Sequence, residues 1–168
     1  MKFATKRTAI EADAIYDDNR LVANDCSVTL PEISFMTADI SAMGTASIPL
    51  QALLEDMEMS ITRVGADKGL ITMCSPGTHA IEIRWVQDVV SPSGAVSTEG
   101  CKAFIKGMPA KIPGIGIEIG SAPENELTFK VTRFKLVMSG KTVLLIDRFA
   151  HKFEINGKDY YKQYGRYL

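Results

Sequence analysis

The sequence predicts a mainly β protein, a β-sandwich or barrel subunit with one short flanking α-helix. Apolar and polar residues alternate with period two along several segments, as they do in strands that bury one face. Turn residues separate these segments at short intervals, which is typical of sandwiches and barrels. Only one segment combines helical spacing with a stop signal. A length of 168 residues corresponds to one domain, 1–168.

The alternation locates the strands in chain order. Residues 57–61 have apolar side chains at the odd positions and polar ones between them. The same pattern predicts strands at 79–90, 101–105, 115–119 and 127–138. In the last of these the apolar phase jumps between Val131 and Phe134, and a slip of one residue reverses the faces of a strand. We therefore expect a β-bulge or sharp bend near Arg133.

Turn and capping residues define the remaining elements. Asp67 is a candidate N-cap, and Ser75-Pro76-Gly77 ends the apolar helical spacing, so we expect the helix at about 67–75. Asn156-Gly157 is the strongest hairpin signal and predicts a C-terminal hairpin at about 149–164.

The N-terminal region and the region after Phe35 are less regular. Thr8-x-x-Glu11 fits a helix capping box, while Asp17-Asp18-Asn19 fits a hairpin turn equally well, so both interpretations stay open. Residues 36–50 contain Ser, Thr, Gly and Pro with few clear core positions. We expect this stretch to leave the body of the protein as a long protruding hairpin.

The charge balance excludes several classes of protein. Nineteen basic and twenty acidic residues give a net charge of -1, which argues against a main role in neutralising phosphates or coating an anionic membrane. The longest apolar runs, such as 143–146, are far below the roughly 20 residues that span a bilayer. Residues 1–7 are charged and lead into Glu11 and Asp13, so we expect no secretory signal and synthesis in a cytoplasm.

Three cysteines, Cys26, Cys74 and Cys101, are widely separated and form no C-x-x-C pair. This spacing favours reduced, buried thiols over a disulfide framework or a zinc site. His79 and His151 lie on alternating segments without nearby ligand residues, so we expect structural roles for both.

Motifs for nucleotide binding or catalysis are incomplete. Gly140-Lys141-Thr142 resembles the end of a phosphate-binding loop, but Lys135 stands where the partner glycine should be. The glycines at 114, 116 and 120 miss the dinucleotide-binding spacing. The acidic cluster at 55–58 is typical of a solvated face or an interface rim. We therefore expect no catalytic, cofactor or metal site and no enzymatic activity.

Tyrosines are concentrated near the C-terminus. The last nine residues contain Tyr160, Tyr161, Tyr164 and Tyr167, with basic residues between them. Such a sequence could stack on single-stranded nucleic acid or form a hot spot of a protein interface. The near-neutral charge favours the interface.

Three ordered stretches resemble the major tail tube proteins of contractile-tail bacteriophages and of phage-tail-like bacteriocins. The first runs from Ser27-Val28-Thr29-Leu30-Pro31 through residues 43–50 to the strand at 57–61. The second is Cys74-Ser75-Pro76-Gly77-Thr78-His79. The third comprises residues 134–141, Ile146-Asp147-Arg148 and residues 153–160. Residues 96–123 and the tyrosine-rich C-terminus depart from the family.

The resemblance implies a subunit of hexameric rings whose strands join into one continuous inner β-barrel. The rings would stack head to tail into a hollow tube, and the hairpin at 36–50 would reach the neighbouring ring. Its candidate contact residues are Met36, Met43, Ile48 and Leu50, and the four C-terminal tyrosines are candidates for a second interface.

The resemblance also implies a function and partners. The tube would be a passive conduit for DNA ejection or for puncturing a target envelope, assembled in the bacterial cytoplasm into a virion or bacteriocin particle. Its partners would be copies of itself, a tail sheath protein, a tape-measure protein, a baseplate or initiator protein and a terminator. DNA would pass without specific binding, so we expect a lumen that is polar and neutral to acidic.

Three other classes of function are alternatives. A secretion-system tube protein shares the ring plan, although Thr29-Leu30-Pro31 and Asn156-Gly157 favour the phage-like family. A monomeric domain that binds single-stranded nucleic acid would use the tyrosine-rich tail. A small β-barrel enzyme or ligand carrier would need a constellation of site residues that the sequence does not offer.

Overall fold

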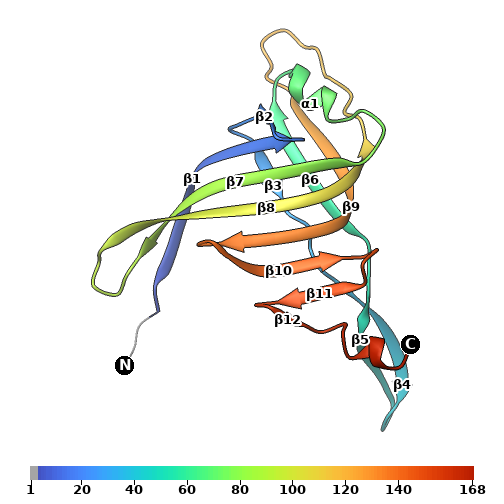
Figure 1. The fold of residues 1–168 in the computed structure, drawn as a ribbon. Helices are drawn as coiled ribbons and strands as arrows, with labels where there is room; N and C mark the ends of the chain where they lie inside the picture. The colour runs from blue at the N-terminus through green and yellow to red at the C-terminus, as the bar shows by residue number, and fades with distance from the viewer. Residues whose placement is uncertain (1–3) are drawn as a thin grey trace.

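A computed structural model describes residues 4–168 of the chain, and Figure 1 shows a protein built almost entirely of strands. In chain order the elements are β1 (Lys6–Asp17), β2 (Arg20–Ala23), β3 (Ser27–Thr29), β4 (Phe35–Ser41), β5 (Thr45–Leu54), β6 (Met57–Val64), α1 (Lys68–Thr72), β7 (His79–Val90), β8 (Val96–Lys111), β9 (Glu124–Met138), β10 (Lys141–Asp147), β11 (Lys152–Ile155), β12 (Lys158–Asp159) and a 3₁₀ turn at Tyr164–Arg166. The mainly β fold class with one short helix is confirmed.

Ten strands form one branched antiparallel sheet. Its main path is β12-β11-β10-β9-β8-β7-β1-β2, and β6 pairs with β9 and carries β3 on its other edge. β7 and β8 form a long hairpin that extends away from the body to the left of Figure 1.

The sheet branches where β9 changes partners. One edge of β9 pairs with β8, while the other pairs with β6 up to Val131 and with β10 from Arg133 onward. The register with β8 shifts here, because Val131 lies opposite Gly107 and Arg133 opposite Lys106. The β-bulge expected near Arg133 is therefore confirmed. Glycine is required at position 107, since a Cβ there would lie 2.8 Å from the Lys130 carbonyl oxygen.

The hydrophobic core lies between the two branches of the sheet and is closed by α1. Alternating side chains of β6, β7, β8 and β9 are buried in it, together with Leu70 and Met73 at the helix. The Asp67 side chain caps α1 by accepting a hydrogen bond of 2.6 Å from the Gly69 amide. The helix thus begins at its expected cap and falls within the expected range of 67–75.

The N-terminal region is a hairpin, so the hairpin interpretation is confirmed and the capping-box helix is wrong. β1 and β2 pair antiparallel through a turn at Asp18 and Asn19, whose φ angles are 45° and 65°. Both residue types tolerate this left-handed conformation, which two-residue hairpin turns require.

The strand expected at 115–119 is wrong. Residues 112–123 form a long connection between β8 and β9 with no strand among them. Ile117 and Ile119 are almost fully exposed instead of buried on a sheet face. The alternation of Ile and Gly is real, but among residues 4–168 the segment has no neighbouring strand to pair with.

Two hairpins occupy the end of the molecule opposite α1 (Figure 1). β4 and β5 pair only with each other, as a separate two-stranded sheet that projects from the body. β11 and β12 turn at Asn156 and Gly157, with φ angles of 50° and 81°, and continue the main sheet.

The cysteines are free thiols: Cys74 and Cys101 are buried and Cys26 is half-buried. Burial is the main cause that raises the pKa of all three thiols above the ordinary value. Among residues 4–168, no helix has the length and apolar character needed to cross a membrane.

Candidate assembly surfaces

The β4–β5 hairpin presents apolar side chains to solvent. Met43 at the turn is fully exposed, and Met36 and Ile48 are about half exposed. We call the exposed apolar residues of this hairpin the hairpin surface; they are Met36, Ile40, Met43, Ile48 and Leu53. Leu50, also expected at this surface, is half-buried and so less exposed than these residues. Asp39 is the one charged residue in the whole of 35–54.

Arg148 fixes the base of the hairpin to the body. Its Nη2 donates to the Leu54 carbonyl oxygen at 2.9 Å and its Nη1 donates to the Glu55 carbonyl oxygen at 3.1 Å. The rings of Phe35 and Phe153 meet edge to face, with centroids 5.8 Å apart. The hairpin is thus held at its base while its tip projects.

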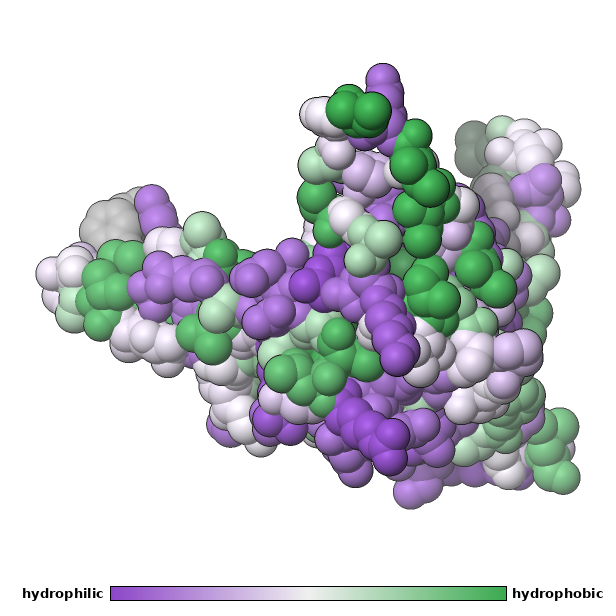
Figure 2. Space-filling view, turned by 90° about the horizontal axis from the view of Figure 1, so that it is seen from above, coloured by the Kyte–Doolittle hydropathy of each residue, from purple (hydrophilic) through white to green (hydrophobic). Residues whose placement is uncertain are grey.

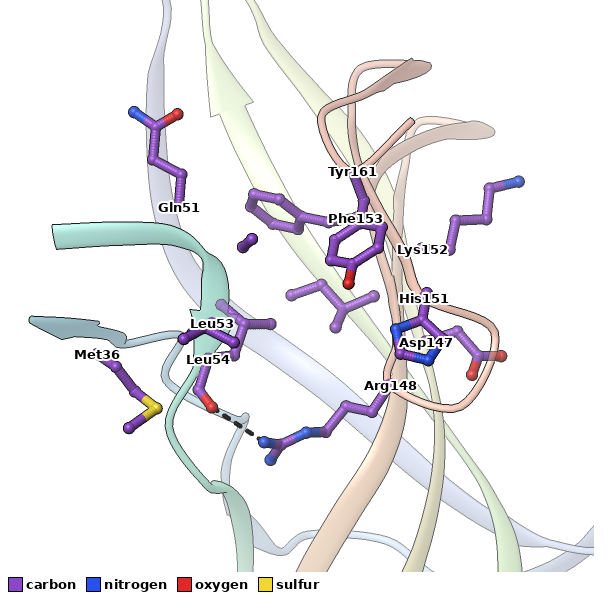
Figure 3. Close-up of a pocket in the computed structure, with 12 residues that line it drawn as sticks. Met36, Gln51, Leu53, Leu54, Asp147, Arg148, His151, Lys152, Phe153 and Tyr161 are labelled. Carbon is purple, nitrogen blue, oxygen red and sulfur yellow. Dashed lines mark hydrogen bonds between the residues drawn. The ribbon is translucent and has the colours of Figure 1, made fainter. Parts of the chain in front are cut away.

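A cavity of about 270 Å³ lies beside this anchor, between the end of β5 and the β10–β11 turn. Figure 3 shows Leu53 and Leu54 on one side of it and His151 and Tyr161 on the other. Its lining combines apolar side chains such as Leu53 and Leu54 with the polar groups of Arg148 and His151.

The C-terminal tyrosines divide into three groups. Tyr161 lies between His151 and Tyr164, with ring centroids 5.4 and 5.6 Å away. Tyr160 instead packs against Phe153 at 6.0 Å, and the Lys158 ammonium lies 4.9 Å from its ring centre. Tyr167 is 90% exposed and stands apart from these stacks. The four residues therefore do not form one continuous aromatic surface.

The connection from 112 to 123 is a second exposed apolar surface, which we call the isoleucine loop. Ile112, Ile115, Ile117 and Ile119 are all exposed on it, and Glu118 is its one charged residue. The view in Figure 2, from the end of the molecule that carries α1 and this loop, shows hydrophobic residues on the surface there. The sequence pattern located Ile115, Ile117 and Ile119 but assigned them to a strand.

Basic residues lie on the open face of the sheet. Lys102 and Lys106 of β8 share this face with Lys135 of β9, which lies opposite Phe104. The Lys135 ammonium is 5.6 Å from the centre of the Phe104 ring. Within the described part of the chain these three lysines form no salt bridge, whereas nearby Lys130 pairs with Glu58 at 2.8 Å. The open face is therefore a charged surface available to a partner.

Glu99 joins four parts of the sheet on the opposite face. Its carboxylate accepts from Arg7 Nε at 2.8 Å, from Ser139 Oγ at 2.6 Å and from Gln87 Nε2 at 2.9 Å. These hydrogen bonds, with that from Arg7 the largest, lower the pKa of Glu99 to about 2. The carboxylate holds the start of β1 and the β9–β10 turn against the β7–β8 hairpin.

His79 joins α1 to the end of β1. One ring nitrogen, Nδ1, lies 2.8 Å from Asp17 Oδ2, and the other, Nε2, lies 2.8 Å from the Ser75 carbonyl oxygen. Both partners are acceptors, so the ring satisfies both only when both nitrogens carry protons. Burial opposes the charged ring, but the bonds to Ser75 and Asp17 outweigh it and raise the pKa of His79 above 6.5.

The other motif residues have structural positions. Gly140-Lys141 lies at the β9–β10 turn, where Ser139 and Gly140 have positive φ. His151 lies in the β10–β11 turn, so its expected place on a strand is wrong. No group of three or more His, Cys, Asp or Glu residues in 4–168 is arranged to hold a metal ion.

Comparison with known proteins gives the family. Two solved structures are similar: a PVC sheath-tube complex in the extended state (14% identity, TM-score 0.46, 75% of this chain and 86% of the other) and a PVC sheath/tube terminator (12% identity, TM-score 0.45, 75% and 91%), both from an extracellular contractile injection system. No curated protein matches the sequence. The family model for phage tail tube protein FII matches residues 7–168, so the chain belongs to this family of structural tail tube proteins.

Proposed function

We propose that this protein is the tube subunit of a contractile tail, and that its copies form six-membered rings which stack head to tail. The match of the family model to residues 7–168 carries the proposal. It covers all twelve strands, and only Lys6, the first residue of β1, lies outside it. Copies within a ring would join through the edges of the branched sheet, since unpaired edges otherwise invite uncontrolled association.

The hairpin surface would contact the adjacent ring. The hairpin is anchored at its base by Arg148 and exposes Met36 and Met43, which is the arrangement of a rigid protrusion with an apolar tip. The tyrosines at 160–167 would form a second contact, in which Tyr167 is the most exposed residue. Rigid aromatic side chains bury much area at low entropic cost, which suits such a contact.

The tube would be a conduit for DNA or an envelope-puncturing device. A sheath protein would surround it, and tape-measure, baseplate or initiator, and terminator proteins would define its length and ends. The particle would be a phage virion or a phage-tail-like bacteriocin assembled in the bacterial cytoplasm. No chemical step is needed for either role.

A neutral to acidic lumen would let DNA pass without being held. This expectation requires Lys102, Lys106 and Lys135 to face outward or to pair with carboxylates of neighbouring copies. Charge mapped onto the assembled tube tests it, because a lumen lined by these three lysines would contradict it.

Negative-stain electron microscopy of the purified chain tests the proposed function. Rings, or tubes of uniform diameter, are expected at high protein concentration. A chain that stays monomeric at every concentration would contradict the proposal. A monomer with salt-sensitive affinity for single-stranded DNA would instead support the nucleic-acid-binding alternative.

A further inference from the structure

The isoleucine loop has the alternation of a strand but has no partner strand within the described residues 4–168. Among residues 112–123, the backbone hydrogen bonds outside strands are a turn from the Ser121 amide to the Glu118 carbonyl and a bond from the Gly65 amide to the Pro123 carbonyl. A Cβ on Gly114 would meet nothing within 4 Å, so one side of the loop is open to another backbone. The isoleucines are exposed on the same segment.

The β4–β5 hairpin also has unpaired backbone edges and exposed apolar side chains. It is a two-stranded sheet, and a two-stranded hairpin alone is marginally stable in water, whereas a third strand and a covered apolar face stabilise it. Its outer edges are unpaired, and the hairpin surface is exposed. Each of the two segments thus offers the other backbone groups for strand pairing and an apolar surface for burial.

The two segments lie at opposite ends of the molecule (Figure 1). The loop follows β8 at the end that carries α1, and the hairpin projects at the other end. Two different surfaces at opposite ends make a heterologous contact, which repeats without closing and so generates a filament. A tail tube grows in this way along its axis.

Charge also favours this pairing. The loop has Glu118 as its one charged residue and the hairpin has Asp39, although 23% of the whole chain is charged. Two long exposed segments that nearly lack charge suit burial against each other, because depletion of charge is typical of interface cores.

We propose that the isoleucine loop of one copy is the docking site for the β4–β5 hairpin of the next copy along the tube. The loop becomes an added strand beside the hairpin, and Ile115, Ile117 and Ile119 pack on the hairpin surface. This inference rests on the proposed function, because it assigns the receiving surface for the contact between rings.

Cross-linking between copies tests the inference on assembled tubes. Met43→Cys and Ile117→Cys are combined in a chain with Cys26→Ser, and the tubes are treated with a short bis-maleimide. Since each copy then carries one reactive thiol at each end, we expect a ladder of dimers, trimers and higher oligomers on denaturing gels. Either cysteine alone should give at most dimers.

A matched control pairs Met43→Cys with Val96→Cys, which is exposed at the tip of the β7–β8 hairpin. This pair should give no ladder. Tubes that form normally but give no ladder with the Met43–Ile117 pair would overturn the inference and leave the proposed function intact. A wild-type chain that forms no tube would instead overturn the proposed function.

A second variant tests the same contact without cross-linking. Ile117→Glu places a charge on a 96% exposed side chain, so its thermal unfolding should match that of the wild type. We expect rings that do not stack, with at least a tenfold loss of tube mass in sedimentation. Glu118→Gln on the same loop should keep full tube assembly. Tubes of normal yield from Ile117→Glu would contradict the proposed contact.

Discussion

The core and the isoleucine loop contain the same alternation of apolar residues but bury them differently. Ile81 and Ile83 of β7 lie between the branches of the sheet, whereas Ile117 and Ile119 are exposed. Methionine shows the same contrast, since Met59 is buried in β6 and Met43 is fully exposed at the hairpin turn. Alternation therefore indicates a segment with one apolar face, and does not indicate whether the covering surface belongs to the same chain.

Substitution of the two methionines should sharpen this contrast most. Met59→Ala removes a side chain that is 1% exposed, and Met-to-Ala changes in cores cost about 2–5 kcal/mol in free energy of unfolding. Met43→Ala should change the free energy of unfolding by less than about 0.5 kcal/mol, as is usual for exposed sites. Urea denaturation of monomeric protein measures both.

Met43→Ala should affect tube assembly although it leaves stability almost unchanged. This variant, folded as well as the wild type, should give shorter or fewer tubes. Equal losses of stability in the two variants would mean that the hairpin tip is part of the folded core, and would contradict its assignment to an assembly surface.

His79 should make the stability of the core region depend on pH. Because its pKa is raised in the folded chain, its contribution is complete below pH 6.5 and is lost as the pH rises through the folded-state pKa. His79→Phe should lower stability at pH 6 by about 1–3 kcal/mol, the cost of leaving a buried acceptor unsatisfied, and should flatten the dependence above pH 6.5. Thermal unfolding from pH 5.5 to 8.5 measures this.

His151→Phe is the matched control for this experiment, because that ring stacks on Tyr161 in a turn outside the core. It should leave the slope between pH 6.5 and 8.5 unchanged. A wild-type protein whose stability rises with pH in this window would contradict the imidazolium bridge between Asp17 and Ser75.

Glu99 should have a smaller effect, at acid pH. A pKa lowered to about 2 means that the carboxylate stabilises the fold above about pH 4.5 and loses this effect as the pH falls toward 2. Glu99→Gln should therefore be less stable than the wild type at pH 6, and the difference should shrink below pH 4.5. Denaturation at several pH values from 2 to 6 gives the curve.

Glu118→Gln, on the exposed isoleucine loop, is the control and should follow the wild-type curve. A Glu99→Gln variant whose difference from the wild type is constant from pH 6 to pH 2 would contradict the lowered pKa.

Local sequence signals predicted the local features of the fold. Asp67 caps the helix, Asn156-Gly157 forms the expected hairpin turn, and the phase jump after Val131 located the bulge. Each of these depends on a few consecutive residues. The branching of the sheet at that bulge could not be predicted, because it depends on which distant strands pair with β9.

The polar bridges and the assembly surfaces also depend on contacts between residues far apart in the sequence, which local sequence signals do not predict. Arg7 and Glu99 are 92 residues apart, and only the register of β1, β7 and β8 brings them together. The strand expected at 115–119 does not form because pairing requires a neighbouring strand, which the described part of the chain does not provide. Sequence therefore located the exposed isoleucines, while their exposure and their position opposite the hairpin required the structure.

A cryo-EM reconstruction of tubes assembled from the wild-type chain shows directly what the hairpin contacts. We expect rings of six copies in which residues 35–54 of one copy lie against residues 112–123 of a copy in the next ring, with the loop paired as a strand. Tubes in which the isoleucine loop faces solvent and the hairpin packs elsewhere would contradict this contact.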